Sequence, residues 1–143
     1  MTCSCSNRQA IIDVLDRYAT CLDTRDWLGL DEVFSPDAKA QYGLRLEGRP
    51  SIVSSIRGFL GGCGPSQHLL GNYEIRIEGD HAEAVTKVRV IHVGAGERAT
   101  LAPYEAIGVY RDELARTTDG WRITHRTFDV HITLGDIEVL QPA

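Results

Sequence analysis

The hydrophobic periodicity of the chain changes once, and this change limits what the chain can fold into. In the first part, apolar residues recur at helical spacing, as Ile11, Leu15 and Leu22 do. From Gln67 onward, apolar and polar residues alternate, which is typical of β-strands. Helices that precede a run of antiparallel strands indicate an α+β fold, in which the helices pack on one face of a curved sheet.

Capping and turn residues divide these two parts into elements. Ser6 or Asn7 can cap the first helix, and Pro50 lies near a helix start, where proline is well placed. We expect helices from residue 7 to about 23–26, over 27–34 and over 49–60. We expect a strand or hairpin over residues 38–46, strands over 67–77, 82–93, 99–111 and 121–134, and a short edge strand over 137–140.

Length and composition fit one globular domain. The chain has 143 residues, of which 43% are hydrophobic and 24% charged, and no repeat or linker divides it. We therefore predict a single domain over residues 1–143, with residues 1–6 as a flexible tail. No apolar run approaches the ~20 residues that span a bilayer, and the N-terminal residues do not resemble a signal peptide. These features predict a cytoplasmic protein.

The charged, cysteine and histidine residues indicate neither nucleic-acid binding nor a metal site. The net charge is −5, and the arginines are scattered rather than gathered in a basic stripe. The four cysteines lack the two ligand pairs that zinc requires, so we expect reduced thiols. His92, His125 and His131 do not form a known metal-binding pattern. We expect no metal.

Several short motifs together resemble one known family. They are Tyr18-Ala-Thr-Cys-Leu-Asp23 with Asp26-Trp27, Phe34-Ser-Pro-Asp-Ala38, Gly48, His68-Leu-Leu-Gly-Asn72, Gly79-Asp80, and Gly120-Trp121-Arg-Ile. From about residue 7 to about residue 140, the chain resembles the SnoaL-like branch of the nuclear-transport-factor-2-like (NTF2-like) superfamily. That branch includes bile-acid 7α-dehydratases, scytalone dehydratases and hexachlorocyclohexane dehydrochlorinases. The resemblance implies a cone in which N-terminal helices and a curved antiparallel or mixed sheet enclose a pocket.

The resemblance also implies four catalytic residues. In the eliminating members, an aspartate at the end of the first helix pairs with a histidine of the first long strand, and these match Asp23 and His68. Tyr18 matches a tyrosine of the bile-acid dehydratases, and Arg126 matches an arginine of the dehydrochlorinases. The dehydrochlorinases have a lysine where this chain has Tyr18, which favours a hydroxyl or carbonyl substrate over a halide.

Taken by their chemistry alone, these residues can carry out an elimination. A carboxylate beside a histidine holds one tautomer and makes a base that works near neutral pH. A tyrosine hydroxyl can donate to a developing oxyanion, which is worth roughly 3 kcal/mol, and an arginine adds a positive field. The set predicts a cofactor-independent lyase, a dehydratase that acts on a small hydrophobic cyclic or polycyclic substrate.

Other interpretations remain open from the sequence. The same dyad can run an isomerisation or a polyketide-type cyclisation, and a pocket can hold a ligand without turning it over. A small subunit of a ring-hydroxylating oxygenase has the same fold. Tyr18 can equally be a packed core aromatic, Asp23 a helix-end residue, and Arg126 a residue paired on the solvated face.

We assign six further residues to the substrate-binding surface: Trp27, Tyr42, Phe59, His92, Tyr104 and Phe128. Neither side of the strand over residues 82–93 is cleanly polar, and a mixed sheet face of this kind often meets a partner. We therefore expect a homo-oligomer, a dimer or a trimer. The expected ligand is a small hydrophobic molecule, with no nucleic acid and no membrane as a partner.

Overall fold

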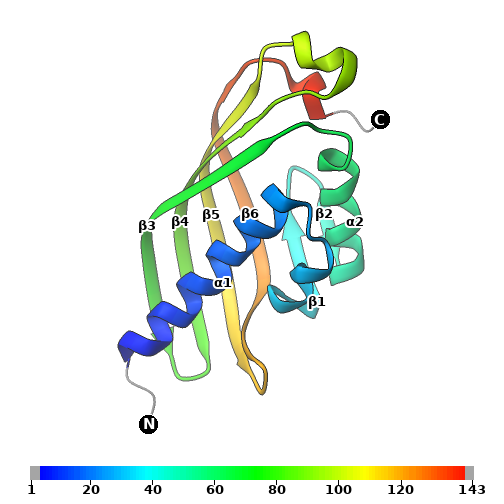
Figure 1. The fold of residues 1–143 in the computed structure, drawn as a ribbon. Helices are drawn as coiled ribbons and strands as arrows, with labels where there is room; N and C mark the ends of the chain where they lie inside the picture. The colour runs from blue at the N-terminus through cyan, green and yellow to red at the C-terminus, as the bar shows by residue number, and fades with distance from the viewer. Residues whose placement is uncertain (1–3, 141–143) are drawn as a thin grey trace.

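The computed structural model describes residues 4–140, which form helices packed on a six-stranded sheet (Figure 1). The helices are α1 (Ser4–Thr24), η1 (Leu28–Glu32), α2 (Arg49–Leu60), η2 (Gly96–Thr100) and η3 (Ile137–Leu140), where η denotes a 3₁₀ helix. The strands are β1 (Phe34–Gln41), β2 (Arg45–Glu47), β3 (Ser66–Glu78), β4 (His81–His92), β5 (Tyr104–Thr117) and β6 (Gly120–Leu134). This arrangement confirms the expected α+β class.

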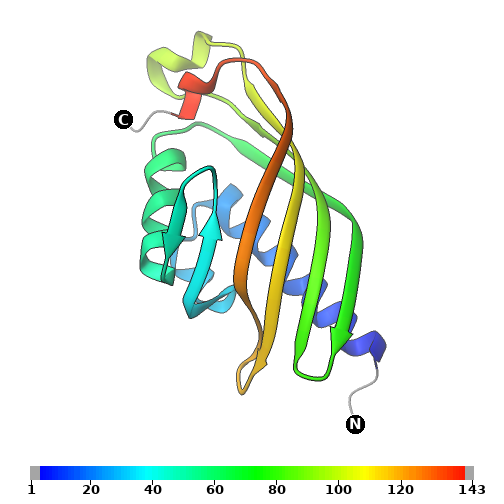
Figure 2. The same cartoon turned by 180° about the vertical axis from the view of Figure 1, so that it is seen from behind.

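The sheet is mixed, and the two α-helices lie on the same face of it. Its strand order is β2-β1-β6-β5-β4-β3, and neighbouring strands run antiparallel except β1 and β6, which are parallel. α1 lies across the inner face and contacts β3 and β6, whereas α2 packs beside β1 and β2 (Figure 1). Seen from behind, the sheet presents a face that no helix of residues 4–140 covers (Figure 2). The core therefore lies between α1, α2 and the inner face.

The core follows the hydrophobic pattern of the sequence. Ile11, Leu15 and Leu22 of α1 are buried, as their helical spacing predicts. Along β4, the side chains at even positions from 82 to 92 are buried, and those at odd positions are exposed or half-buried. The burial of these two apolar surfaces against each other supplies the main driving force for folding.

The first helix begins at Ser4, ahead of the capping positions expected at Ser6 or Asn7. Residues 4–6 of the expected flexible tail are therefore helical, and residues 1–3 lie outside the described residues. The segment contains no glycine or proline, the two residues that disfavour a helix interior most strongly, so the helix extends toward the N-terminus.

The expected second helix is shorter than its pattern indicates. Only Leu28–Glu32 is helical, as one 3₁₀ segment, and Phe34 already begins β1. Pro36 lies inside that strand. The pairing of β1 with β6 is irregular between Phe34 and Lys39, and an irregular stretch tolerates a residue without an N–H.

Two later expectations are also corrected. The segment 96–100 forms η2, so β5 runs from Tyr104 to Thr117 rather than over 99–111. The expected edge strand over 137–140 is the 3₁₀ helix η3. Asp136 accepts a hydrogen bond from the backbone N of Glu138 at 2.9 Å, a local turn that starts a helical segment instead of a strand. η3 then buries Val139 completely.

Two β-bulges in β6 change which of its side chains face inward. Trp121 and Ile123 point into the core, but the register with β5 shifts after Ile123. Arg126, three residues later, is consequently buried as well. A second shift opposite Ile107 and Gly108 occurs near the other end of the strand. Simple alternation along β6 therefore fails at both places.

Within residues 4–140, no helix has both the length and the apolar character needed to cross a bilayer.

The expected homo-oligomer stays a prediction. Several large apolar side chains are exposed on this chain, among them Leu69, Ile91, Ile132 and Leu134. Such side chains are the kind that an interface between copies would cover.

Substituting Gly108 tests how tightly the second bulge is packed. A Cβ at this position would lie 1.9 Å from the carbonyl oxygen of Asp129, so the backbone of β6 would have to move. We expect Gly108→Ala to lower the free energy of unfolding by about 1–3 kcal/mol or more, as overpacking does. Urea denaturation followed by circular dichroism measures this change.

Gly71→Ala is the matched control in β3, because a Cβ there meets nothing within 4 Å. It should leave stability unchanged or raise it by up to about 1 kcal/mol. Equal stability of the Gly108 and Gly71 variants would contradict the close packing of β5 against β6.

Candidate functional site

A cavity of about 310 Å³ opens between the C-terminal half of α1, α2, the inner face of the sheet and η3. No Asp, Glu, Lys or Arg is among the described residues that line it. The lining residues are Tyr18, Leu22, Tyr42, Gly43, Ser55, Ile56, Phe59, Leu60, His68, Val90, His92, Tyr104, Ala106, Tyr110, Phe128, Val130, Ile137 and Leu140. An apolar concavity with a few convergent polar groups is typical of a small-molecule site.

The side chain of Asp23 holds His68 at the edge of this cavity. The Nδ1 atom of His68 lies 2.6 Å from Oδ1 of Asp23, and the backbone N of His68 donates to Oδ2 at 2.9 Å. Asp23 lies near the end of α1 and His68 near the start of β3, so this contact joins two elements that are distant in sequence. The side chain of His68 is 4% exposed and that of Asp23 is 24% exposed.

This contact assigns the tautomer of His68. A carboxylate can only accept a hydrogen bond, so Nδ1 must carry the proton and donate it. In the neutral ring, Nε2 then holds the free lone pair, and it makes no hydrogen bond to any residue in the described range 4–140. Because His68 lines the cavity, this nitrogen can act as a base toward a bound molecule.

Two tyrosine hydroxyls meet in the same cavity. The hydroxyls of Tyr18 and Tyr42 lie 3.1 Å apart and share a hydrogen bond. The ring of Tyr18 also packs edge-to-face against the ring of His68, with 6.3 Å between centroids. Burial raises the pKa of Tyr18, while the neighbouring charge of Arg126 lowers it in part. The phenol therefore stays protonated at neutral pH and is a hydrogen-bond donor.

Arg126 lies beneath the cavity wall and does not line it. It is completely buried and forms a two-pronged ion pair with Asp112, at 2.7 Å for Nε and 2.8 Å for Nη2. Its guanidinium packs on two aromatic rings, 4.2 Å from the centroid of Tyr18 and 3.9 Å from that of Tyr110, and these two rings contact each other edge-to-face. These contacts stabilise a buried cation through the faces of the rings and the carboxylate. Arg126 thus does not line the cavity, but its charge acts on the lining residues Tyr18, Tyr42 and Tyr110.

A second histidine, His92, lies beside His68. The two ring centroids are 5.6 Å apart, and the ring of His92 also stacks on Tyr104. The Nδ1 atom of His92 lies 2.6 Å from the hydroxyl of Ser66. Burial, followed by the neighbouring His68 and Arg25, lowers the pKa of His92 to about 4. His92 is therefore a neutral imidazole at neutral pH.

The structure brings together most of the residues selected from the sequence. Seven of them line the cavity: Tyr18, Tyr42, Phe59, His68, His92, Tyr104 and Phe128. Asp23 is not among the lining residues, but it contacts His68, which is. Trp27 does not line the cavity, because it sits at the start of η1 and packs partly buried against the core instead. Arg126 is displaced from the cavity surface by the rings of Tyr18 and Tyr110.

Sequence reasoning missed four residues that shape the site: Arg25, Ser66, Tyr110 and Asp112. Alternation along β5 carries a signal for two of them, because Tyr110 and Asp112 share their side of the strand with the buried Leu114. A buried aspartate requires a cationic partner, which points to Arg126. No comparable pattern marks Arg25 or Ser66, whose contacts depend on the loop between α2 and β3.

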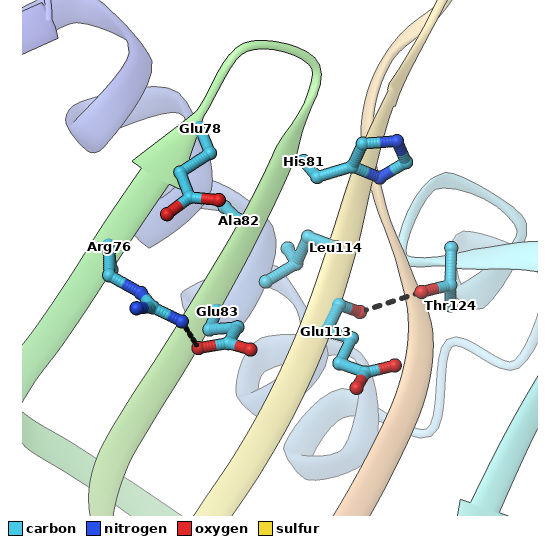
Figure 3. A pocket seen from close by; sticks show the side chains of 8 residues that line it. All are labelled: Arg76, Glu78, His81, Ala82, Glu83, Glu113, Leu114 and Thr124. Carbon is cyan, nitrogen blue, oxygen red and sulfur yellow. Dashed lines mark hydrogen bonds and ion pairs between the residues drawn. The ribbon is translucent and has the colours of Figure 1, made fainter.

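The outer side of the sheet has a second hollow, of about 170 Å³, with a different lining (Figure 3). Its charged side chains are exposed, Thr124 is half-buried, and Arg76 of β3 pairs with the neighbouring Glu83 of β4. Within residues 4–140, no three His, Cys, Asp or Glu side chains are grouped so that they could hold a metal ion. The candidate site is therefore the apolar cavity, with the Asp23–His68 dyad at its edge.

Comparison with known proteins agrees with this geometry at the level of the fold. The cone of helices and curved sheet is the fold of the NTF2-like superfamily, which solved structures of that class share. Residues 4–127 match the family model of the SnoaL-like domain. The chain belongs to this SnoaL-like family.

The similar proteins include both sequence relatives and solved structures. The uncharacterized protein Rv2910c of Mycobacterium tuberculosis is 35% identical over 85% of this chain and 83% of its own. A protein of Novosphingobium aromaticivorans, provisionally named an aromatic ring hydroxylase, is 27% identical over 98% of this chain and 100% of its own, with a TM-score of 0.85.

Two further structures share the fold at lower identity. One, provisionally named a scytalone dehydratase, also from Novosphingobium aromaticivorans, is 20% identical over 90% of this chain and 87% of its own, with a TM-score of 0.82. The other is the hexachlorocyclohexane dehydrochlorinase LinA-type3 of Novosphingobium barchaimii. It is 14% identical over 92% of this chain and 90% of its own, with a TM-score of 0.78.

Removing one partner of the buried ion pair should destabilise the fold strongly. In Arg126→Met, the carboxylate of Asp112 is left buried without its cation, which costs about 3–5 kcal/mol of unfolding free energy. The double variant Arg126→Met/Asp112→Leu removes both charges and should regain most of that loss. Urea denaturation of the two variants measures the difference. A double variant no more stable than the single one would show that packing on Tyr18, and not charge pairing, dominates.

The buried neutral His92 should make stability depend on pH. Its pKa is about 4 in the folded protein and 6.5 in its ordinary state. Between these values the unfolded chain binds a proton that the folded protein does not, so stability falls as pH falls from 6.5 to 4. The loss reaches about 3 kcal/mol at pH 4. The unfolding free energy of His92→Gln should therefore change less over this range, and parallel curves for variant and wild type would refute the assignment.

Proposed function

We propose that the protein is a cofactor-independent lyase, a dehydratase that acts on a small hydrophobic cyclic or polycyclic molecule. The observation that carries this proposal is the Asp23–His68 dyad, with 2.6 Å between Oδ1 and Nδ1, at the edge of an apolar cavity of about 310 Å³. Two solved structures of the same fold bear names that denote eliminations, a dehydratase and a dehydrochlorinase.

The proposed reaction uses the free Nε2 of His68 as the base. It removes a proton from the carbon next to a substrate carbonyl, and the electron pair of that C–H bond forms an enolate. As the enolate collapses, a C=C bond forms and the C–O bond of a β-hydroxyl breaks. The imidazolium returns its proton to the leaving oxygen, so that water departs and His68 is regenerated.

The lining of the cavity supports an uncharged substrate. No described residue that lines it is Asp, Glu, Lys or Arg, and its polar groups are phenols, imidazoles and one serine hydroxyl. A charged ligand would lose its hydration there without a partner of opposite charge. The hydroxyls of Tyr18 and Tyr42 can donate to an oxyanion that forms only during the reaction.

The same groups support an isomerase or a cyclase as the alternative. If the proton taken by His68 returns to a different carbon, or the enolate attacks a second carbonyl, no hydroxyl needs to leave. A binding module without turnover is the third candidate, although the short Asp23–His68 contact supports a chemical role. Product mass separates these outcomes, because only net dehydration removes water.

The test is turnover of bicyclic β-hydroxy ketones, followed by mass spectrometry of the products. We expect the wild-type protein to release the dehydrated ketone. His68→Gln should lower kcat by about 10²-fold or more, because the base is lost. Asp23→Asn should lower it by about 10²-fold, because an amide N–H facing Nδ1 reverses the tautomer of His68.

His131→Gln is the matched control, because this exposed histidine of β6 does not line the cavity. It should keep turnover close to wild type. Turnover by His68→Gln within a few-fold of wild type would exclude His68 as the base. A product of unchanged mass would favour the isomerase, and bound but unaltered ketone would favour the binding module.

A further inference from the structure

The two histidines of the cavity are held by partners of opposite hydrogen-bonding character. Nδ1 of His68 faces the carboxylate of Asp23, which can only accept. Nδ1 of His92 faces the hydroxyl of Ser66 at 2.6 Å. A hydroxyl can donate or accept, so the tautomer of His92 depends on what else Ser66 contacts.

The neighbours of Ser66 indicate the direction of its hydrogen bond to His92. Nη2 of Arg25 donates to the hydroxyl oxygen of Ser66 at 3.1 Å, and a guanidinium has no acceptor to offer in return. Among the described residues, the hydroxyl hydrogen of Ser66 has one acceptor within reach, which is Nδ1 of His92. Ser66 therefore donates, Nδ1 of His92 accepts, and the single proton of the neutral ring resides on Nε2.

Arg25 is itself rigidly placed. Its Nη1 donates to the carbonyl of Leu22 at 2.6 Å, and its Nη2 donates to the carbonyl of Gly64 at 2.6 Å. Its backbone has a φ of 59°, in the left-handed region, just past the end of α1. The register of the sheet fixes Ser66 relative to His92, because Ser66 of β3 and His92 of β4 are direct cross-strand partners.

We propose that Arg25 and Ser66 are positioning residues that hold His92 as the Nε2–H tautomer. The cavity then presents one imidazole that accepts a proton, His68, and one that donates a hydrogen bond, His92. Both rings line the cavity, and Nε2 of His92 makes no hydrogen bond to any residue between positions 4 and 140.

The electrostatic surroundings keep His92 neutral, as this role requires. The groups that face it are His68 on β3, Arg25 and Asp23 at the end of α1, and Tyr104 on β5. Burial, His68 and Arg25 disfavour its protonation, and only Asp23 favours it. A neutral donor is suited to an uncharged oxygen such as a ketone carbonyl.

A catalytic role for Nε2–H of His92 rests on the function proposed above. The tautomer of His92 does not depend on that function. In the proposed dehydration, Nε2–H of His92 would bind the substrate carbonyl while Nε2 of His68 takes the neighbouring proton. The 5.6 Å between ring centroids allows both rings to contact one small molecule. The substrate class is therefore an uncharged ketone whose acidic C–H lies close to its oxygen.

The relay is the chain of hydrogen bonds from Arg25 through Ser66 to His92. Proton-detected ¹⁵N spectra of histidine-labelled protein test it without any substrate. We expect the neutral ring of His92 to be purely Nε2–H, and the neutral form of His68 to be purely Nδ1–H, in the wild-type protein. In Ser66→Ala, Nδ1 of His92 loses its donor, so the ring should populate both tautomers. Its pKa should rise by about 0.5–1 unit, the equivalent of one lost hydrogen bond.

Two further variants separate the relay from general damage. Ser66→Thr keeps the hydroxyl and should restore the Nε2–H tautomer, and Ser55→Ala removes a different serine of the same cavity and should leave His92 unchanged. His92 found as Nδ1–H in the wild-type protein would overturn the proposal, even if Ser66→Ala fails to fold. So would an unchanged His92 in a folded Ser66→Ala.

The outcomes for the two histidines are independent. If His68 is not Nδ1–H, the proposed base lacks its free lone pair and the lyase proposal fails, while the relay through Ser66 can stand. If His68 is Nδ1–H and His92 is too, the relay fails and the base remains.

Discussion

The carboxylate of Asp23 organises the site, because it receives two hydrogen bonds from one residue. The backbone N–H of His68 fixes where β3 begins relative to the end of α1, and the ring N–H fixes the rotation and tautomer of the imidazole. Both degrees of freedom are thus settled by folding, before any ligand binds. A base held in this way needs little reorganisation when it reacts, which is the principal means by which enzymes lower barriers to proton transfer.

The same end of α1 supplies the second anchor. Arg25 follows Asp23 by two residues, and its left-handed backbone ends the helix and turns its side chain toward the loop that leads into β3. One short segment therefore reaches both histidines, His68 directly and His92 through Ser66. Under our proposal the acceptor and the donor of the cavity are set by a single helix terminus, so distortion of this segment would disturb both at once.

Helical spacing and strand alternation were enough to predict the core stripe of α1, the α+β class and the existence of every long strand. The resemblance to a family then selected Asp23 and His68, which the fold brings into contact. Alternation along β6 could not place Arg126 inward, because a bulge after Ile123 shifts the register. The same limit applies to residues 137–140, where the side chain of Asp136 accepts a hydrogen bond from the backbone N–H of Glu138, which favours a 3₁₀ helix over an edge strand. Periodicity describes regular elements and carries no information about where they break.

The buried ion pair explains how a cation can lie next to an uncharged cavity. Asp112 accepts two hydrogen bonds from Arg126, at 2.7 and 2.8 Å, and the guanidinium also packs on the rings of Tyr18 and Tyr110. The charge of Arg126 still acts on the cavity lining, where it partly offsets the effect of burial on the pKa of Tyr18 and Tyr42, and its packing on the ring helps to fix the plane of Tyr18. That plane in turn directs the Tyr18 hydroxyl toward Tyr42, beside the ring of His68. A site of this kind has no strong attraction for a charged ground state, but it has oriented donors for negative charge that appears during reaction, which is the electrostatic pattern that an elimination through an enolate requires.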